Sequence, residues 1–393
     1  MKKERLPTTE DVPFDSPEHY ASYLKKYGFK GVGFSGGEPL LVFDKLLAYI
    51  EKIRAVCGRS VYLWVYTNGD LVTEEKLRRL ERAGLDEIRF NISANDYDLR
   101  PVELAVDIID TVTVEVPAIP EDHERMKKCL AKMEKIGVKH LNIHQLHTTK
   151  YNYKNHRDRG YTLLHYPYPP VFESEMAALR LIKYALDKKV GLPINYCSAM
   201  YKNRLQSKGK RDRKARWVME DFEELTGAGY IRRLSVRDSA ANIKKNAKIL
   251  SGIKGSSRLW SWNGGRAELF VHGALLKRMD IGKSGLLVRY FEPRYEKDPG
   301  PGEPGCAVEL NCTDKIHITK KLVAEYEISN EVTIKSFQKK FVEGREWNKV
   351  LKFFYGSHGR KTDASSETLR KEIGLLSVLK VWEDLGVGFP EVY

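Results

Sequence analysis

The first half of the chain alternates short runs of β-branched and aromatic residues with stretches that carry helix start and stop signals. Six runs are expected to be strands, at residues 31–34, 61–66, 87–93, 111–117, 140–146 and 192–197. Helical segments between most of them favour parallel pairing, because parallel neighbours need a crossover connection. Repeated right-handed crossovers curl a sheet toward a barrel. The sequence therefore predicts an α/β fold with a partial, parallel TIM-like barrel.

A turn that exposes its backbone follows the run at 31–34. Gly36 and Gly37 let the main chain approach a ligand where any Cβ would collide. Glu38 offers a fixed anion to a bound ammonium group, and Pro39 stops the strand. In parallel barrels ligands bind at the carboxyl ends of the strands. We expect the turn to share that rim with the residues that end the later runs: Asn68, Ser93, Pro117, Gln145 and Cys197.

The chain resembles the radical SAM superfamily in three places: the Gly36-Gly37-Glu38-Pro39 turn, Thr67-Asn68-Gly69 after the next strand, and Ser93 closing the one after it. The resemblance spans roughly residues 16 to 200, about half of the chain. It implies that Gly36, Gly37 and Glu38 hold the amino-acid moiety of S-adenosylmethionine, with Pro39 in the same turn. Ser93 would touch the ribose, Asn68 would be a neighbour, and Gln145 would be one of the later strand ends that contact the cofactor.

More loosely, the chain is similar to an archaeal group related to pyruvate formate-lyase activating enzymes. That similarity lies in Asn195-Tyr196-Cys197-Ser198, Tyr201-Lys202 and Gln206. Membership of the superfamily would imply a [4Fe-4S] cluster, an electron donor such as ferredoxin or flavodoxin, and a 5′-deoxyadenosyl radical that abstracts hydrogen from an unknown substrate.

The cysteines depart from this pattern. The family binds its cluster through C-x3-C-x2-C after the first strand, and cluster iron needs thiolate ligands. No three cysteines of this chain are close in sequence, and none lies before Cys57. The five are Cys57, Cys129, Cys197, Cys306 and Cys312.

The start of the chain suggests a reason. Ser16 and Pro17 open a helix that Gly28 ends, so the first complete element is a helix. Residues 1–15 form a polar leader with Pro7 and Pro13, in which no strand is expected. Either the natural product begins upstream, so that the leader is a remnant of the cluster loop and the first barrel strand is missing, or the chain is a cluster-free relative. An unpaired parallel edge disfavours the second alternative, and an in-frame C-x3-C-x2-C upstream of Met1 would decide for the first.

Basic residues concentrate in one segment of a chain whose net charge is +14. Between residues 202 and 216 only Asp212 opposes eight of them, and the candidate nucleic-acid patch comprises Lys208, Lys210, Arg211, Arg213 and Lys214. Such a segment can neutralise phosphates of RNA. A solvated basic helix, or a contact with a polyanionic protein surface, explains it equally well.

Several single residues have two interpretations. His144 and His147 could ligate a metal or carry protons, but such histidines are more often hydrogen-bonded core or rim residues. Cys197 is a candidate catalytic residue, as a radical donor or auxiliary-cluster ligand, although a buried structural thiol is the commoner role. Trp260 and Trp262 could stack a base, but packing is the more frequent use.

The domain organisation expected is a leader at 1–15, a radical SAM-like partial barrel at 16–200, a basic linker at 201–229 and an α+β accessory domain at 230–393. Scattered cysteines and the lack of an apolar leader or a membrane-length run favour a cytoplasmic protein that does not contact membranes.

The sequence thus favours a radical SAM-type enzyme acting on an unknown substrate, RNA or protein among the candidates. The alternatives are an RNA-modifying member of the superfamily and a cluster-free, non-catalytic relative that binds a nucleoside or RNA.

Overall fold

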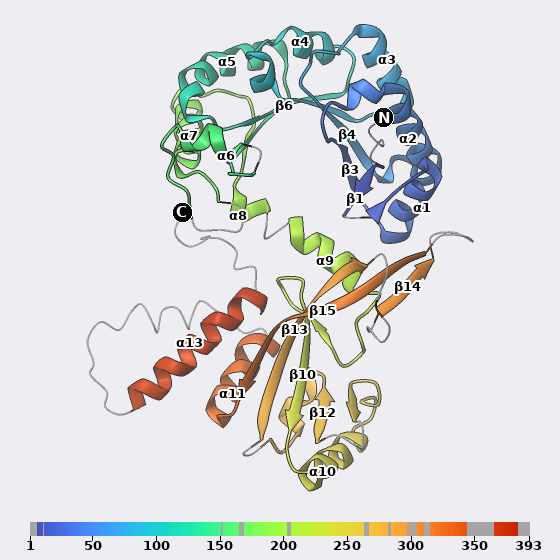
Figure 1. Cartoon of the computed structure of the whole chain (residues 1–393), viewed down its shortest axis with the longest axis vertical. Helices are drawn as coiled ribbons and strands as arrows, with labels where there is room; N and C mark the ends of the chain where they lie inside the picture. Colours follow the sequence, from blue (N-terminus) through green and yellow to red (C-terminus); the bar gives the residue numbers. More distant parts are fainter. Residues whose placement is uncertain are drawn as a thin grey trace. The chain divides into compact units, whose positions relative to one another are not determined.

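The computed structural model describes residues 6–10, 12–150, 152–164, 169–202, 206–262, 267–281, 284–296, 300, 305–309, 315–343 and 365–383. The chain divides into two compact units, which Figure 1 shows as ribbons. Unit 1 is built chiefly from residues 13–203. Unit 2 is built chiefly from residues 204–309 and 315–393.

A six-stranded parallel sheet forms the centre of unit 1 and curls into a partial TIM-like barrel (Figure 1). Its strands follow one another in chain order: β3 (Gly31–Phe34), β4 (Tyr62–Thr67), β5 (Glu87–Phe90), β6 (Thr111–Pro117), β7 (His140–His144) and β8 (Ile194–Cys197). All five pairings are parallel. The predicted fold class is confirmed.

Helices precede or connect the strands, and most of them lie along the outside of the curl (Figure 1). They are α1 (Pro17–Tyr27), α2 (Phe43–Cys57), α3 (Glu74–Ala83), α4 (Arg100–Val106), α5 (His123–Ile136), α6 (Tyr153–Arg157), α7 (Phe172–Asp187) and α8 (Ala199–Tyr201), with short 3₁₀ turns η1 (Pro39–Val42), η2 (Gly58–Ser60), η3 (Ile92–Asn95) and η4 (Pro120–Asp122). The predicted caps of α1 are confirmed. The Ser16 side chain accepts a hydrogen bond from the His19 amide, and Gly28 closes the helix at φ 65°.

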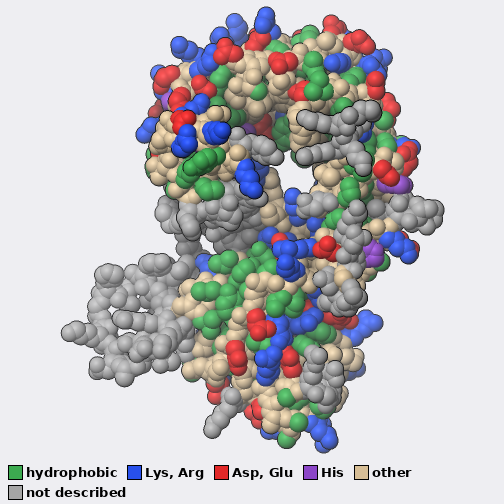
Figure 2. All heavy atoms as spheres, in the orientation of Figure 1, with side chains coloured by type: hydrophobic (Ala, Val, Ile, Leu, Met, Phe, Trp, Pro, Cys, Tyr) green, Lys and Arg blue, Asp and Glu red, His purple; other side chains and the backbone are tan. Residues whose placement is uncertain are grey.

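The two faces of the curled sheet differ in polarity. Leu63, Val65, Ile88 and Val114 are fully buried beneath the helices. Period-2 alternation places their neighbours on the inner face, and many of those are charged or polar. Leu141 and Ile143 belong to the outer face, so Asn142 and His144 line the inner one. On the outside of unit 1, acidic and basic side chains are interspersed over the helices (Figure 2).

The leader differs from the expectation of a polar segment without strands. Thr8–Thr9 (β1) and Val12–Pro13 (β2) form a separate two-stranded sheet. Phe14 is buried, with its ring centroid 4.9 Å from that of Tyr20 and 5.0 Å from that of Tyr23. The tyrosine side of α1 gives the segment an apolar surface to pack on, which the composition of the leader alone does not reveal.

Unit 2 is an α+β unit built on a seven-stranded antiparallel sheet. Its strand order is β11 (Trp260–Trp262), β12 (Glu268–Val271), β10 (Ile231–Arg237), β13 (Gly285–Glu296), β15 (Lys315–Ile328) and β14 (Gly305–Glu309), with β9 (Glu224–Leu225) beside β10. The remaining elements are α9 (Ser207–Ala215), α10 (Ala240–Ser251), η6 (Gly273–Arg278), α11 (Glu331–Phe337), the π-helical turn η7 (Gln338–Val342) and α13 (Ser365–Glu383). Trp260 and Trp262 pack against the apolar core of this unit.

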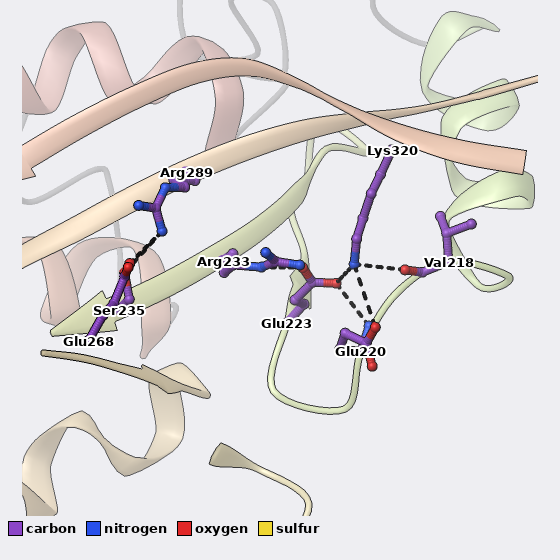
Figure 3. A network of polar contacts seen from close by, with 8 residues as sticks. All are labelled: Val218, Glu220, Glu223, Arg233, Ser235, Glu268, Arg289 and Lys320. Atoms are coloured by element: carbon purple, nitrogen blue, oxygen red, sulfur yellow. Dashed lines mark hydrogen bonds and ion pairs between the residues drawn. The ribbon is translucent and has the colours of Figure 1, made fainter. Parts of the chain in front are cut away.

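Charged side chains occupy the face of this sheet opposite the α10–α11 core (Figure 3). Lys320 donates to Glu223 Oε2 at 2.8 Å and to the Val218 carbonyl at 2.9 Å. Arg233 binds the other oxygen of Glu223 at 2.6 Å. A second group joins Arg289 to Glu268 at 2.6 Å. The charged side chains described here are thus buried with partners of opposite charge, as the cost of removing charge from water requires.

Across the described ranges of both units, no helix combines the length and the apolar character needed to cross a membrane.

Candidate functional site

The Gly-Gly turn lies at the carboxyl end of β3, the first strand of the parallel sheet. Gly36 has φ 101° and Gly37 φ 71°, angles that other residues rarely adopt. A Cβ added to either glycine would meet no atom within 4 Å, so the turn faces open space. Among the residues the structure describes, no hydrogen bond engages the backbone of Ser35, Gly36 or Gly37. The turn therefore presents free backbone donors and acceptors to a ligand.

Glu38 fixes this turn to the next strand. Its Oε1 accepts a hydrogen bond from the Leu40 amide at 3.0 Å, and its Oε2 accepts one from the Asn68 amide at 2.8 Å. Pro39 is buried and begins η1. The geometry supports a positioning role for the carboxylate, while its predicted contact with an ammonium group stays a prediction.

The residues predicted on the neighbouring strands also follow carboxyl ends. Asn68 lies just after β4, where its side chain makes reciprocal hydrogen bonds with Asp70. The strand expected to run to Ser93 ends earlier, at Phe90, and Ser93 belongs to η3. There its hydroxyl donates to Asn91 Oδ1 at 2.7 Å. A polar Asn-Ile-Ser-Ala-Asn stretch competes with strand geometry through such local hydrogen bonds.

Gln145 is buried after β7 and joins three segments. Its Nε2 donates to the Val171 carbonyl at 3.2 Å, and its Oε1 accepts from the Ala199 amide at 3.0 Å. The side chain thereby supports the loops at this rim, and its predicted contact with a cofactor stays a prediction.

Cys197 ends β8 and pairs in register with His144 on β7. Burial raises the pKa of the Cys197 thiol, although the charge of Lys202 opposes this effect. Burial, together with the charges of Lys202 and His147, lowers the pKa of His144 to about 4. Both groups are therefore neutral at pH 7. The Nδ1 atoms of His144 and His147 are buried and have no hydrogen-bond partner among the described residues.

A polar network on the inner face was not singled out by sequence. Arg89 on β5 donates to both oxygens of Glu87, at 2.8 and 3.0 Å. It also donates to Glu115 Oε2 at 3.1 Å and to the Tyr66 hydroxyl at 3.2 Å. The sequence feature that could have indicated this network is charge at alternate positions of otherwise apolar strands, as in Glu87-Ile88-Arg89.

Two glycines of β3 make room for the aromatic part of this network. A Cβ on Gly33 would lie 2.5 Å from the indole of Trp64, so the ring packs directly on the backbone of β3. The Arg89 guanidinium lies 4.7 Å from the centre of that ring, a cation–π arrangement. Burial opposes the charge of Arg89, but its hydrogen bonds to Glu87 and the charges of Glu87 and Glu115 raise its pKa above the usual value.

The basic patch predicted for nucleic acid lies on α9, in unit 2. Arg211 and Lys214 are buried. Arg211 donates twice to the Ala228 carbonyl, and Lys208 pairs with Asp212. Arg213 and Lys214 pair with Glu10, which leaves Lys210 as the exposed member of the patch. Four of the five side chains are thus engaged within unit 2.

The described side chains can be compared with the ligand sets that hold metal ions. In the described ranges no group of three His, Cys, Asp or Glu residues could hold a metal ion. Cys57, Cys129, Cys197 and Cys306 are free thiols, and Cys312 lies outside the described residues. The four described thiols lie far apart in the sequence, and no three of them are set to ligate one [4Fe-4S] cluster.

Comparison with known proteins supports the resemblance found in the sequence. Residues 2–148 match the family model of the radical SAM superfamily. The resemblance to that superfamily is confirmed. The chain is also 29% identical, over 258 residues, to a protein of Methanocaldococcus jannaschii named "Putative glycyl-radical enzyme activating enzyme". The match covers 63% of this chain and 66% of that protein, just under two thirds of its length.

Solved structures are more distant. The radical S-adenosylmethionine methyltransferase TsrM of Kitasatospora setae, solved with cobalamin and a [4Fe-4S] cluster, is 16% identical with a TM-score of 0.26, over 31% of this chain and 29% of that one. A dipeptide epimerase of Enterococcus faecalis is 13% identical with a TM-score of 0.31, over 50% and 48% of the two chains. Similarities this low assign no function to the chain.

Proposed function

We propose that this protein is a radical SAM-type enzyme that binds S-adenosylmethionine at the carboxyl rim of the parallel sheet. One observation carries the proposal: two adjacent glycines with positive φ angles face open space, next to backbone groups without partners and a carboxylate that fixes the turn. The α-ammonium and α-carboxylate of the cofactor need such donors and acceptors at close approach.

In this proposal Gly36 and Gly37 contact the amino-acid moiety through their backbone, while Glu38 and Pro39 set the shape of the turn. Asn68 lies on the neighbouring strand end, and Ser93 contacts the ribose from η3. Gln145 acts through the loops that it joins. These roles are those that the resemblance to the radical SAM superfamily implies, and the position of each residue after a strand of the same sheet supports them.

Bound S-adenosylmethionine supplies radical hydrogen abstraction in this superfamily. The contribution of the chain is to orient the cofactor, exclude water and hold a substrate C–H bond close to it. The described thiols do not fit the cluster, and an external electron donor such as ferredoxin or flavodoxin is implied only by the resemblance to the superfamily. The name of the Methanocaldococcus relative supports a protein substrate.

Equilibrium binding of S-adenosylmethionine by Gly37→Ala tests the proposal against a matched control. Gly28 caps α1, and it too has a positive φ, 65°, and open space around its Cα. Gly28→Ala therefore imposes a similar backbone strain, of about 1–2 kcal/mol, away from the rim. We expect Gly37→Ala to lose affinity at least tenfold and Gly28→Ala to keep it. Equal affinities in both variants, or no binding by the natural chain, would reject the site.

A second candidate is a cluster-free relative that binds a nucleoside without catalysis, which the scattered cysteines favour. Equal affinity for S-adenosylmethionine and adenosine would support it, because the amino-acid moiety would then contribute nothing. An RNA-modifying enzyme is a third candidate. Lys210 and Arg216 are the exposed basic side chains of the α9 region, so Lys210→Glu with Arg216→Glu should abolish a gel shift if RNA binds there.

A further inference from the structure

A cavity of unit 2 lies between α9 and β13, two elements that pack against each other (Figure 1). Its volume is about 360 Å³, which is within the range of small-molecule sites. Among the described residues, its charged lining comprises four cations and one anion: Lys210, Arg211, Lys214, Arg294 and Glu292. This imbalance favours a ligand that carries negative charge.

Most of these cations come from one face of α9. Four residues of the helix line the cavity at spacings of i, i+3, i+4 and i+7, which a helix places on one side: Ser207, Lys210, Arg211 and Lys214. In a helix that packs on a sheet, such a stripe is usually apolar. Here Ala215 is the single hydrophobic residue of the helix. The face therefore does not serve apolar packing, and an anion is the partner that it suits.

Arg211 is the clearest sign of a missing anion, because it is only 9% exposed. Its Nε and Nη2 donate to the Ala228 carbonyl at 3.2 and 2.7 Å, and its guanidinium lies 4.3 Å from the centre of the Tyr230 ring. Both of these partners are uncharged. No carboxylate of the described part of the chain pairs with Arg211. Buried charges are ordinarily paired, so an anionic ligand would supply the counter-charge.

Arg211 also keeps hydrogen-bonding capacity for such a ligand. A guanidinium has five N–H groups, and the contacts with Ala228 use two of them. The carbonyl and the Tyr230 ring fix the guanidinium plane, so the remaining N–H groups are preorganised. Lys210 adds an exposed ammonium group that pairs with none of the residues that the structure describes. The two side chains can thus contact one ligand from the same helix face.

The excess of positive charge at the cavity matches a phosphate group. Arg294 binds Glu292 at 2.6 Å, and Lys214 Nζ lies 3.8 Å from Glu10 Oε2. Two carboxylates thus offset two of the four cations, which leaves about +2 for a ligand. A phosphate monoester carries about −1.5 to −2 at pH 7 and has three strong acceptor oxygens. A carboxylate would bring only one negative charge.

The same charges suit a small molecule better than a nucleic-acid chain. A nucleic acid is held by cations that follow its backbone over several phosphates. On α9, however, Lys208 pairs with Asp212 and Arg213 pairs with Glu10. These two positions therefore do not extend the positive charge along the helix, and the excess is concentrated at the cavity.

We propose that this cavity is a phosphate site, which binds a phosphate monoester or free phosphate through Arg211 and Lys210. Arg294 and Lys214 supply further positive charge. This site goes beyond the proposed function, since it lies within unit 2 and needs neither S-adenosylmethionine nor the parallel sheet of unit 1.

Titration calorimetry of the full chain tests the proposal with three probes: ribose 5-phosphate, inorganic phosphate and ribose. None of them carries the adenine base of S-adenosylmethionine. The test variant is Lys210→Gln with Arg294→Gln, because both side chains are exposed. Arg211 is left in place, since its hydrogen bonds to Ala228 also hold the segment before β10, so lost binding would resemble lost folding.

The control variant, Lys244→Gln with Arg258→Gln, makes the same charge change elsewhere in unit 2. Lys244 is an exposed lysine of α10. Arg258 is an exposed arginine that pairs with Asp221 at 3.6 Å, as Arg294 pairs with Glu292. Hydrogen exchange of the natural chain, with and without ribose 5-phosphate, locates the bound probe.

We expect the natural chain and the control variant to bind the phosphate probes alike, and the test variant to bind them at least tenfold more weakly. Ribose should not bind, and ribose 5-phosphate should slow exchange of the α9 amides. An ester that binds more tightly than inorganic phosphate would identify a monoester as the ligand. Equal affinity for the two probes would identify free phosphate.

The proposal is overturned if neither phosphate probe binds, or if the test and control variants lose the same affinity. A gel shift of single-stranded RNA that the test variant loses, and for which neither probe competes, would assign the site to nucleic acid instead. The three proteins should bind S-adenosylmethionine equally, so failure of the cofactor site would leave this test intact.

Discussion

Replacing Arg89 by methionine is expected to destabilise unit 1 by about 3 kcal/mol. The guanidinium makes two hydrogen bonds to Glu87, whose side chain is only 6% exposed, and one to Glu115. Removing one member of a buried ionic group costs about 3–5 kcal/mol, because the remaining charge stays without compensation. The lower end applies here, since Arg89 is itself 19% exposed and water can approach the vacated position.

Hydrogen exchange of the β5 and β6 amides measures this loss within the unit, whereas one unfolding curve of a two-unit chain mixes two transitions. The control is Arg78→Met on α3, which removes an exposed Arg78–Glu74 pair one helical turn apart. Such pairs contribute only about 0.3–0.5 kcal/mol. Adding Glu87→Gln to Arg89→Met should restore about half of the lost stability. If Arg89→Met costs no more than Arg78→Met, the buried triad does not stabilise the barrel as argued.

Three further predictions concern other parts of the chain. Folding lowers the pKa of His144 from about 6.5 to about 4, so the folded state binds fewer protons than the unfolded state between these pH values. The free energy of unfolding should therefore fall by roughly 3 kcal/mol as the pH drops from 6.5 to 4. Acid titration of unfolding should show that this slope is smaller in His144→Gln; an unchanged slope would contradict the assignment. Lys320→Met should cost about 2–4 kcal/mol in unit 2, because the side chain is 2% exposed and binds the buried Glu223. The exposed control Lys321→Met should cost under about 0.5 kcal/mol, and hydrogen exchange of the β13 and β15 amides measures both variants. Anaerobic reconstitution of this chain with iron and sulfide should give no stoichiometric [4Fe-4S] absorbance, since no three of its cysteines are close in sequence; a full cluster would refute that reasoning.

The sequence predicted the six strands of the parallel sheet and the limits of α1, because local and long-range signals agree there. Ser16, Pro17 and Gly28 mark the ends of α1, and alternating apolar residues mark each strand. The end of β5 was placed too late, since hydrogen bonding between Ser93 and Asn91 turns the chain into η3 after Phe90. The leader was judged by composition, although Phe14 packs on the aromatic side of α1.

The candidate site was only partly predictable, because some of its contacts are local in sequence and others depend on how the strands pair. The Gly36-Gly37 turn can be recognised because its chemistry is local. The inner-face network depends on register: the parallel pairing of β5 and β6 sets Arg89 beside Thr113, and Glu115, two residues further along β6 on the same face, accepts its hydrogen bond. Charge at alternate strand positions was visible in the sequence, but which face looked inward was not. Likewise, the engagement of Arg211 and Lys214 within unit 2 could not be deduced from the run of basic residues.

Hydrogen exchange with and without S-adenosylmethionine tests the central claim most directly. The account predicts slower exchange of the amides at residues 35–40 and 67–70, with little change around Gly28 or in unit 2. Protection confined to unit 2, or to the opposite ends of the parallel strands, would contradict the assignment of the Gly-Gly turn as the cofactor site.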